Sequence, residues 1–385
     1  MKRLWIILAV IALVLSCMPV WSRAAGLEVE GKSAVLMDVA TGTVLYEKNA
    51  HEKLAPASVT KVMTMLLIME AIDDGRIGWS DTVTVSETAA AKGGSQVYLK
   101  VGETMTVSDM LKSIAVSSAN DCACAMAEHI AGSEDAFVER MNSRAKELVM
   151  EDTHFVNCTG LDDGENAREH RTSAWDIALM SRQLIGHHPK IKEFTTIWMD
   201  TIRNGTFGLS NTNKLIRFYS GATGLKTGFT SGAGYCLSAT AQREGMELIA
   251  VVMGCETAPI RNSACKAMLD YGFANYAVVT PEMPDAEGVA VRLGNVEKIS
   301  VKPEREPRLL LEKSQKNSVT TEVTLEESVT APVVQGQKLG VMTVKAGEKI
   351  LEEIPLVAVA EVARLNWREL TVRVLRQVAM AKENR

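Results

Sequence analysis

The sequence predicts an α+β (α/β) chain, in which a domain of sheet and helices is followed by a small all-β domain and a C-terminal amphipathic helix. Strand-like segments lie on both sides of a long block with helical spacing, so the first sheet should gather segments from both ends of its domain. Short Val- and Thr-rich segments follow from about residue 280, and an apolar stripe at helical spacing closes the chain. We expect a signal peptide at 1–24, a first domain of sheet and helices at 25–278, a β-sandwich-like domain at 279–358 and an amphipathic helix at 359–385.

The composition is that of an ordinary globular protein. The chain has 385 residues, of which 46% are hydrophobic and 23% charged, with room for about two domains. Its formal net charge of −5 lacks the basic character of a nucleic-acid-binding domain. We therefore expect no nucleic-acid partner.

The N-terminus predicts export. Two basic residues precede an apolar run at Leu4–Ser16, and small residues at Ser22 and Ala24 fit a signal-peptidase site. The run is shorter than the roughly 20 residues of a membrane span, so an uncleaved anchor is the weaker alternative. A lipoprotein signal at Cys17 is a second, poorer alternative.

Six cysteines remain once the leader is removed. An even number in an exported chain permits disulfides. However, Cys122 and Cys124 lie two apart in a helical pattern and point to different sides, and no spacing resembles a metal site. The pattern favours buried free thiols over bridges, and we expect no metal and no cofactor.

The first domain, at 25–278, should contain two hairpins around its helical block. Residues 33–48 give two strand-like runs separated by a turn at 40–42, just before the apolar helix that carries Ser58. Residues 234–255 give a second pair of β-rich runs around 243–245. We expect a helix over 262–279 to end the domain.

The C-terminal region shows no concentration of catalytic side chains. Its runs "EGVAVRL", "VTTEVTL" and "KLGVMTV" are separated by Pro, Gly or charge, as in a small β-sandwich. The last segment carries more basic than acidic residues and a tryptophan in its apolar stripe, which suits a membrane surface. Packing of this helix on its own domain is an equally good interpretation. The stripe is formed by Trp367, Leu370, Val374, Val378 and Ala381.

Ser58 and Lys61 are the first candidate catalytic pair. They lie three positions apart near the start of the apolar helix, so hydroxyl and amine share one face. A lysine acts as a base only when desolvation or a nearby cation depresses its pKa. Alone, this S-x-x-K pattern is weak evidence, because a helix cap beside a solvated lysine would look the same.

Two further motifs strengthen this interpretation. Ser118-Ala119-Asn120 follows the pair by 60 residues (118 − 58), and Lys226-Thr227-Gly228 follows by another 108 (226 − 118). Singly, the first is explained as a helix cap and the second as an edge-strand lysine before a turn. Together with S-x-x-K they stand in the order found in serine β-lactamases and penicillin-binding proteins.

On these motifs the chain resembles the serine-type D-alanyl-D-alanine carboxypeptidases of peptidase family S11, the low-molecular-mass penicillin-binding proteins. "LAPASVTKVMT", "VSSANDCACAMAEHIAG" and "GLKTGFTSGAGYCLSATA" carry the resemblance, which extends over nearly the whole mature chain. It implies a β-lactamase/transpeptidase-like catalytic domain that removes the terminal D-alanine from peptidoglycan stem peptides ending in D-Ala-D-Ala. It also implies inhibition by β-lactam antibiotics and a location at the outer face of the cytoplasmic membrane or in the cell wall.

The resemblance also implies roles for individual residues. Ser58 would be the acylated nucleophile, Lys61 its base and Ser118 a proton relay. Backbone N–H groups of Ser58 and Phe229 would form the oxyanion hole.

Substrate binding would involve five residues. Asn120 would hold the substrate amide, and Lys226 would keep Lys61 neutral through its positive charge. Thr227 and Arg261 would bind the terminal carboxylate, with Arg261 assigned only by its offset from Lys226. Gly228 completes the K-T-G motif.

The sequence departs from some relatives at two places. Phe229 stands where some carry a histidine, which excludes a polar role there. Thr212 or Asn213 stands where some carry an arginine, which weakens carboxylate contacts from that side.

Rival catalytic devices find little support in the sequence. There is no G-x-S-x-G or H-E-x-x-H motif, and all six histidines lie outside the three motifs, which favours structural roles for them. A class A β-lactamase needs a deacylating glutamate, and no convincing one lies between Ser118 and Lys226. The sequence still leaves room for a transpeptidase, or for a non-enzymatic module that senses penicillin.

Overall fold

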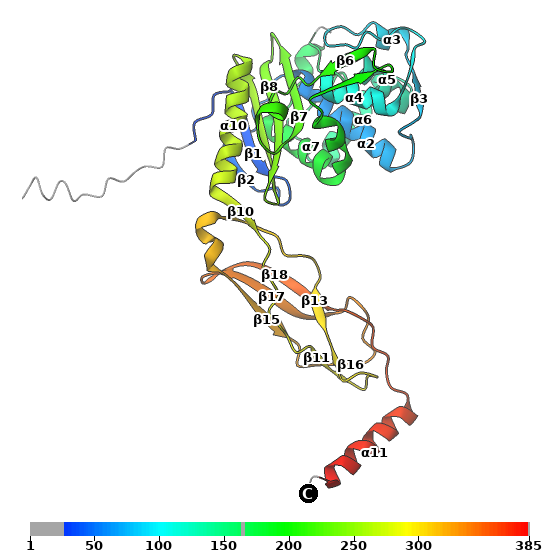
Figure 1. Cartoon of the computed structure of the whole chain (residues 1–385), viewed down its shortest axis with the longest axis vertical. Coiled ribbons are helices and arrows are strands. Elements are labelled where there is room, and N and C mark those ends of the chain that lie inside the picture. The colour runs from blue at the N-terminus through cyan, green and yellow to red at the C-terminus, as the bar shows by residue number, and fades with distance from the viewer. Residues whose placement is uncertain (1–26, 163–165, 384–385) are drawn as a thin grey trace, which may run out of the picture.

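The computed structural model describes residues 27–162 and 166–383. The predicted signal peptide at 1–24 and the lipoprotein signal at Cys17 lie outside the described residues. The helix-rich domain, the β-rich domain and the terminal helix follow one another along the long axis (Figure 1). The predicted α+β architecture is confirmed.

A five-stranded antiparallel sheet organises the first domain. Its order is β2-β1-β9-β8-β7, so the N-terminal hairpin lies beside strands from more than 190 residues later. The sheet therefore gathers both ends of the domain, as the sequence predicts, and leaves β7 at an edge. The strands are β1 Ser33–Asp38, β2 Val44–Lys48, β7 Ala222–Thr230, β8 Gly234–Arg243 and β9 Met246–Cys255.

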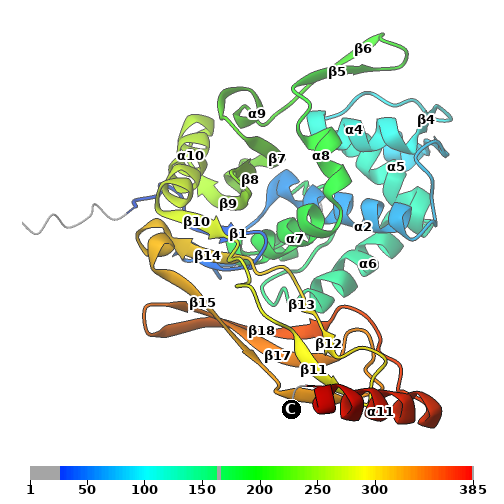
Figure 2. The same cartoon turned by 60° about the horizontal axis from the view of Figure 1, so that its bottom comes forward.

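Helices cover both faces of this sheet (Figure 2). On one face, α10 (Ala258–Asn275) packs its Met268 and Leu269 in one cluster with Leu36 and Leu248 of the sheet. On the other face lie α7 (Ala174–His187) and, next to it, α2 (Lys61–Asp73). The sheet is thus buried on both sides, and its central strands carry nearly continuous apolar residues.

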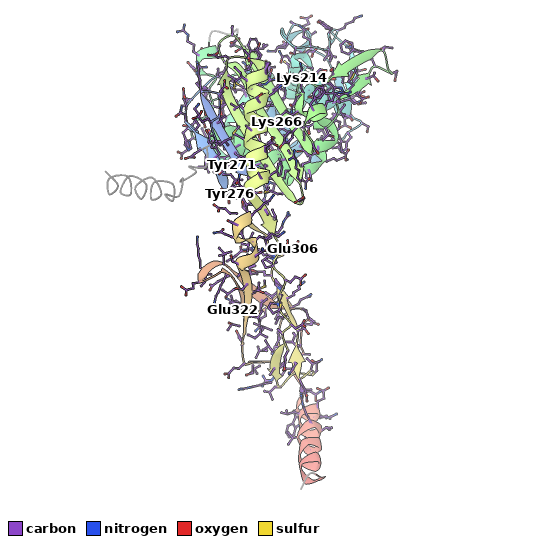
Figure 3. The ribbon with its side chains drawn as sticks, turned by 60° about the vertical axis from the view of Figure 1, so that its left-hand side comes forward. Lys214, Lys266, Tyr271, Tyr276, Glu306 and Glu322 are labelled. Carbon is purple, nitrogen blue, oxygen red and sulfur yellow. The ribbon has the colours of Figure 1, made fainter. Side chains whose placement is uncertain are left out.

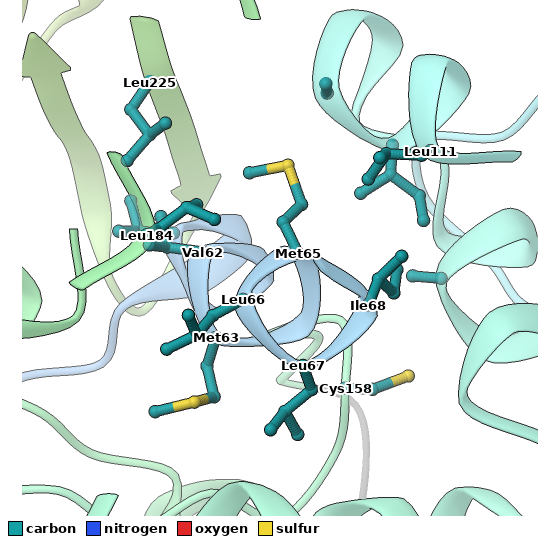
Figure 4. Close-up of a cluster of buried hydrophobic side chains, with 14 of the residues drawn as sticks. Val62, Met63, Met65, Leu66, Leu67, Ile68, Leu111, Cys158, Leu184 and Leu225 are labelled. Atoms are coloured by element: carbon teal, nitrogen blue, oxygen red, sulfur yellow. The ribbon is translucent and has the colours of Figure 1, made fainter. Parts of the chain in front are cut away.

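Helix α2 is buried around its whole circumference. Every side chain from Lys61 to Met69 is buried, which matches the uniformly apolar sequence after Lys61. Met65, Leu66 and Ile68 point away from the axis in different directions, toward neighbouring helices and the sheet (Figure 4). Because neighbours surround it, α2 is a rigid base for the residues at its N-terminus.

The remaining helical block holds the second motif. Helix α4 (Val107–Ser117) ends at Ser118, whose φ of 62° is left-handed, and α5 (Asn120–Ala131) begins two residues later. Gly132, with φ of 86°, ends α5. The other elements of this domain are η1 Ala57–Thr60, β3 Thr82–Thr84, α3 Glu87–Ala90, β4 Thr104–Thr106, α6 Glu134–Glu147, η2 Ala167–Glu169, η3 Pro189–Ile191, α8 Lys192–Thr195, β5 Met199–Ile202, β6 Phe207–Ser210 and α9 Leu215–Phe218.

The junction between the two domains differs from the predicted helix over 262–279. Helix α10 ends at Asn275, and Tyr276–Val279 form strand β10, which pairs with β14 (Leu309–Glu312). Aromatic and β-branched side chains in Tyr-Ala-Val-Val suit a strand, so this pairing overrides the helical pattern. Tyr271 and Tyr276 lie at this junction with ring centroids 6.2 Å apart (Figure 3). The predicted boundary at 278 falls inside β10, and the division into domains stays a prediction.

The β-rich domain contains a three-stranded sheet, β12-β11-β16, and a four-stranded sheet, β13-β18-β17-β15. One buried cluster, around Val289 and Leu339, takes side chains from both sheets, and a second, around Met342 and Ile354, belongs to the four-stranded sheet. The elements are β11 Val289–Arg292, β12 Lys298–Ile299, β13 Val301–Pro303, η4 Lys313–Ser318, β15 Val319–Leu325, β16 Ser328–Thr330, β17 Lys338–Ala346 and β18 Lys349–Ala358.

The terminal helix α11 spans Trp367–Glu383, so it begins later than the predicted segment 359–385. Val362, within that segment, instead pairs with Val333 of the β-rich domain. Trp367 is 79% exposed and Leu375 64% exposed. In the described part of the chain, no helix has the length and apolar character needed to cross a bilayer.

Candidate active site

Ser58 lies where the η1 turn meets strand β7. A Cβ on Gly228 would lie 2.7 Å from the carbonyl oxygen of Pro56 and 3.1 Å from the backbone nitrogen of Ser58. Only glycine allows this approach, so Gly228 brings the β7 main chain beside the candidate nucleophile. The S-x-x-K and K-T-G segments therefore meet.

Lys61 contacts Ser58 from the first turn of α2. Its Nζ lies 2.9 Å from Ser58 Oγ and donates a hydrogen bond to the carbonyl oxygen of Thr159 at 2.7 Å. The side chain is fully buried, and this burial lowers the pKa of Lys61 from 10.5 to about 7, although Cys158 and Asp121 oppose the shift. At neutral pH much of the amine is uncharged and able to accept the Ser58 proton.

Ser118 and Asn120 come from the tight junction between α4 and α5. Asn120 Nδ2 donates to the carbonyl oxygen of Gly93 at 2.7 Å, which fixes the amide orientation. Its Oδ1 is buried and has no hydrogen-bond partner among the described residues. A buried carbonyl oxygen without a donor is costly, so this atom is suited to accept an N–H from a ligand.

Lys226 lies buried on β7 with its Nζ 2.8 Å from the carbonyl oxygen of Thr227. Burial lowers the pKa of Lys226 well below its ordinary value, and the positive charges of Lys61 and Arg261 lower it further. The two lysines are thus close enough to interact. The low pKa of Lys61, however, comes chiefly from its own burial, and a charge effect of Lys226 on Lys61 stays a prediction.

Thr227 follows Lys226 on β7, and Arg261 of α10 is close enough for its charge to act on Lys226. Thr227 Oγ1 donates to Thr212 Oγ1 at 2.6 Å. Arg261 is 6% exposed and donates from Nε to Asn262 Oδ1, yet among the described residues no carboxylate lies within 4.0 Å of its guanidinium. Burial lowers the pKa of Arg261. A buried guanidinium without an acidic partner is suited to an anionic ligand.

Phe229 continues the β7 edge beyond Gly228. Its ring is 53% exposed and stacks on Tyr235 at 4.2 Å between centroids, while the Arg261 guanidinium lies 5.8 Å from the Tyr235 ring. Tyr235 of β8 thus lies next to both Phe229 of the edge strand and Arg261 of α10. At the other substituted position, Asn213 Nδ2 donates to the carbonyl oxygen of Gly224, which is a structural contact within the domain.

The loop that supplies Thr159 belongs to none of the three sequence motifs and was not predicted. Asn157 Oδ1 accepts from the backbone N–H groups of Thr159 and Gly160, so one side chain shapes the loop. A Cβ on Gly160 would lie 1.8 Å from the carbonyl oxygen of Ala57, next to the nucleophile. Asn-x-Thr-Gly is a turn signal, but no pattern in a single sequence shows which segment its carbonyl contacts.

His170 is a second missed contributor. The Val156 N–H donates to His170 Nδ1 at 3.0 Å, so the ring proton lies on Nε2, which is 2.7 Å from Thr60 Oγ1. Thr60 Oγ1 in turn donates to the Ala57 carbonyl. Burial lowers the pKa of His170 from 6.5 to about 4, with help from His154, Arg171 and Lys61. Neutral His170 thereby supports the η1 turn that carries Ser58, a structural role that its sequence position does not reveal.

The six cysteines from Cys122 to Cys265 are free and buried. Within residues 27–162 and 166–383, no group of three His, Cys, Asp or Glu side chains is arranged to hold a metal ion. A serine hydroxyl in contact with a buried amine of lowered pKa, on a sheet-plus-helices scaffold, is an arrangement suited to serine acyl transfer.

Comparison with known proteins agrees with this class. The D-alanyl-D-alanine carboxypeptidase model of peptidase family S11 matches residues 20–257, and the model for the C-terminal domain of penicillin-binding protein 5 matches residues 284–364. D-alanyl-D-alanine carboxypeptidase DacF of Bacillus subtilis is 44% identical over 342 residues, which is 87% of each chain. The chain therefore belongs to the D-alanyl-D-alanine carboxypeptidase family S11.

Solved structures extend the likeness to the fold. Penicillin-binding protein 5 from Haemophilus influenzae superposes with a TM-score of 0.74 at 28% identity, covering 88% of this chain and 98% of that one. Penicillin-binding protein D2 from Listeria monocytogenes, in its ampicillin-bound form, gives a TM-score of 0.59 at 32% identity, covering 64% and 99%. The protein is a serine D-Ala-D-Ala carboxypeptidase of the penicillin-binding class.

Proposed function

We propose that Ser58 is the acylated nucleophile and Lys61 its general base. The observation that carries this assignment is the 2.9 Å contact between Lys61 Nζ and Ser58 Oγ, made by an amine whose pKa is about 7. Ser58 Oγ attacks the carbonyl carbon of the penultimate D-alanine while its proton passes to Lys61 Nζ. Backbone N–H groups of Ser58 and Phe229 stabilise the tetrahedral oxyanion.

The intermediate then collapses. The peptide C–N bond breaks, and Ser118 passes a proton from Lys61 to the leaving amine, so free D-alanine departs and an ester remains on Ser58. Water hydrolyses the ester and returns the proton to Ser58 Oγ. A β-lactam forms the same ester by opening its ring amide, but its leaving group stays attached to the acyl part, which favours a long-lived adduct.

The substrate is held by side chains of the second and third motifs and of helix α10. Asn120 Oδ1 accepts the substrate amide N–H, because this oxygen is buried without a donor in the described residues. Thr227 Oγ1 and the Arg261 guanidinium bind the terminal carboxylate, and Gly228 keeps β7 close to Ser58. Lys226 lies close enough to Lys61 for a charge on one amine to disfavour a charge on the other.

Release of D-alanine from a synthetic pentapeptide tests the assignment. Ser58→Ala should abolish release, whereas Ser263→Ala, on α10 outside the three motifs, should leave it unchanged. Full D-alanine release by Ser58→Ala would overturn the assignment. An added amine acceptor that diverts most of the acyl group would identify a transpeptidase, and rapid turnover of penicillin would identify a β-lactamase.

We further propose that the protein acts outside the cytoplasmic membrane and attaches to the membrane surface through α11. Trp367, Val374 and Leu375 expose apolar area on a helix that also carries basic residues, a combination suited to an anionic interface. Co-sedimentation with phosphatidylglycerol vesicles tests this: the full chain should bind, and Trp367→Ser combined with Leu375→Ser should weaken binding. Equal binding by this variant would overturn attachment through α11.

A further inference from the structure

Glu134 makes a set of contacts that the acyl-transfer site does not yet explain. It opens helix α6, and its carboxylate lies 2.5 Å from Lys92 Nζ. The same carboxylate accepts from the backbone N–H and the thiol of Cys158, both at 3.2 Å. Cys124 Sγ of α5 lies 3.8 Å from it. One side chain thus joins two loops to helices α5 and α6.

Each loop contact lies one residue from a carbonyl group that holds a proposed catalytic or binding side chain. Lys92 precedes Gly93, whose oxygen accepts from Asn120 Nδ2 at 2.7 Å. Cys158 precedes Thr159, whose oxygen accepts from Lys61 Nζ at 2.7 Å. Neighbouring Cα atoms are only about 3.8 Å apart along the chain, so anchoring one residue of each loop limits how far the next carbonyl group can move.

The carboxylate is well placed to act as a charged anchor. Its side chain is 14% exposed, and that of Lys92 is 23% exposed. Burial disfavours the charged form of Glu134, but the hydrogen bond and charge of Lys92 outweigh it, so the pKa of Glu134 is lowered. Partly buried charge-assisted hydrogen bonds are stronger than neutral ones, which makes this contact more than a surface ion pair.

We propose that Glu134 is a positioning residue that aims the Thr159 and Gly93 carbonyls at Lys61 and Asn120, acting separately on catalysis and on substrate binding. The inference rests on the proposed roles of Ser58, Lys61 and Asn120. The Thr159 carbonyl directs the Lys61 amine toward Ser58 Oγ, so its loss should slow acylation. The Gly93 carbonyl orients the Asn120 amide, so its loss should weaken binding before acylation.

Four variants of the full chain separate the contact of Glu134 with Lys92 from its contact with Cys158. Glu134→Ala removes both contacts. Glu134→Gln keeps an oxygen for Cys158 but loses the charge that pairs with Lys92. Lys92→Met removes the same ion pair by replacing the lysine instead. Asp135→Asn is the matched control, because Asp135 is an acidic residue in the same first turn of α6 and its loss changes the charge at the helix end equally.

Stopped-flow acylation by a fluorescent penicillin gives the dissociation constant before acylation and the acylation rate constant. Glu134→Ala should lower the rate constant about tenfold and raise the dissociation constant several-fold. Glu134→Gln and Lys92→Met should both raise mainly the dissociation constant, and Asp135→Asn should match the wild type. Thermal unfolding identifies any variant that does not fold. If Glu134→Ala does not fold, the constants of Glu134→Gln and Lys92→Met test the positioning role.

The outcomes distinguish the inference from the proposed function. Wild-type protein that forms no adduct on Ser58 would refute the proposed function. If the adduct forms, folded Glu134 variants with wild-type constants would overturn the positioning role. So would a change in Asp135→Asn equal to that in Glu134→Gln, because it would show a general charge effect.

Discussion

Gly160 and Ala57 lie so close that the Cβ missing from Gly160 would stand 1.8 Å from the Ala57 carbonyl oxygen. Ala57 itself has φ of 48°, which is unusual for a residue other than glycine. The contact holds the loop that ends at Gly160 against the turn that carries Ser58. Thr159 and Lys61 meet because of it.

Gly160→Ala should therefore destabilise the protein and slow acylation. Gly160 has φ of 82°, so alanine adds backbone strain as well as a clash with rigid main chain. We expect a loss of about 3 kcal/mol or more in the free energy of unfolding, measured by urea denaturation. Gly132→Ala is the control, because φ there is 86° but a Cβ would meet nothing within 4 Å. That variant should lose only about 1 kcal/mol, and equal losses would show that the clash is relieved.

Acylation should depend on pH through Lys61. The protonated amine cannot accept the Ser58 proton, so the acylation rate should rise as pH increases through about 7 and level off above it. Lys61→Arg stays charged throughout and should show no measurable acylation. A stopped-flow rate profile between pH 5 and 9 gives the midpoint, and a rate independent of pH would contradict the role of Lys61 as base.

His170 should make stability depend on pH on the acid side. Its pKa is about 4 in the folded protein and near 6.5 when unfolded, so the unfolded chain binds more protons between these values. The stabilising contribution is complete above about pH 6.5 and is lost as pH falls toward 4, by about 3 kcal/mol at most. The folded state should keep the proton on Nε2 throughout this range.

Urea denaturation from pH 7 to pH 4 checks this dependence. His170→Gln should flatten it, whereas His154→Gln, at an exposed neighbouring histidine, should leave most of it. An unchanged slope in His170→Gln would assign the acid sensitivity to other groups.

Arg261 should act mainly on substrate affinity. Its buried guanidinium has no acidic partner in the described residues, so Arg261→Gln should raise KM for a D-Ala-D-Ala peptide about tenfold or more with a smaller change in kcat. Arg261→Lys should recover only part of the loss, because an amine lacks the forked geometry. A peptide ending in D-alaninamide provides the control. Arg261→Gln should cost it little, and an equal loss with both peptides would show a general structural effect.

Much of the fold followed from the sequence because its signals are local. The helix that follows Ser58, α2, is apolar on every side, and the hairpins around 40–42 and 243–245 carry clear turn residues. The predicted end of α10 was wrong because Tyr276–Val279 form a strand only through pairing with residues 309–312, further along the chain. Tertiary contacts of that kind leave no trace in a local pattern.

The residues of the candidate site also divide into those that a local sequence pattern predicts and those that only long-range contacts reveal. Ser58, Lys61, Ser118 and Lys226 stand in motifs with fixed spacing, which a single sequence displays. Thr159 acts through a backbone carbonyl 98 positions from Lys61, and His170 through a neutral ring 110 positions from Thr60. Glu134 acts through an ion pair with a lysine 42 positions away. Their residue types are common in turns and helix ends, so only the folded chain shows what they contact.

The central claim is that three distant segments converge so that the Lys61 amine activates Ser58. Intact mass measurement after benzylpenicillin treatment, followed by peptide mapping, tests it most directly. We predict one adduct per chain, located on Ser58, absent from Ser58→Ala and not formed at a measurable rate by Lys61→Arg. An adduct on any other residue, or one that persists in Ser58→Ala, would contradict it.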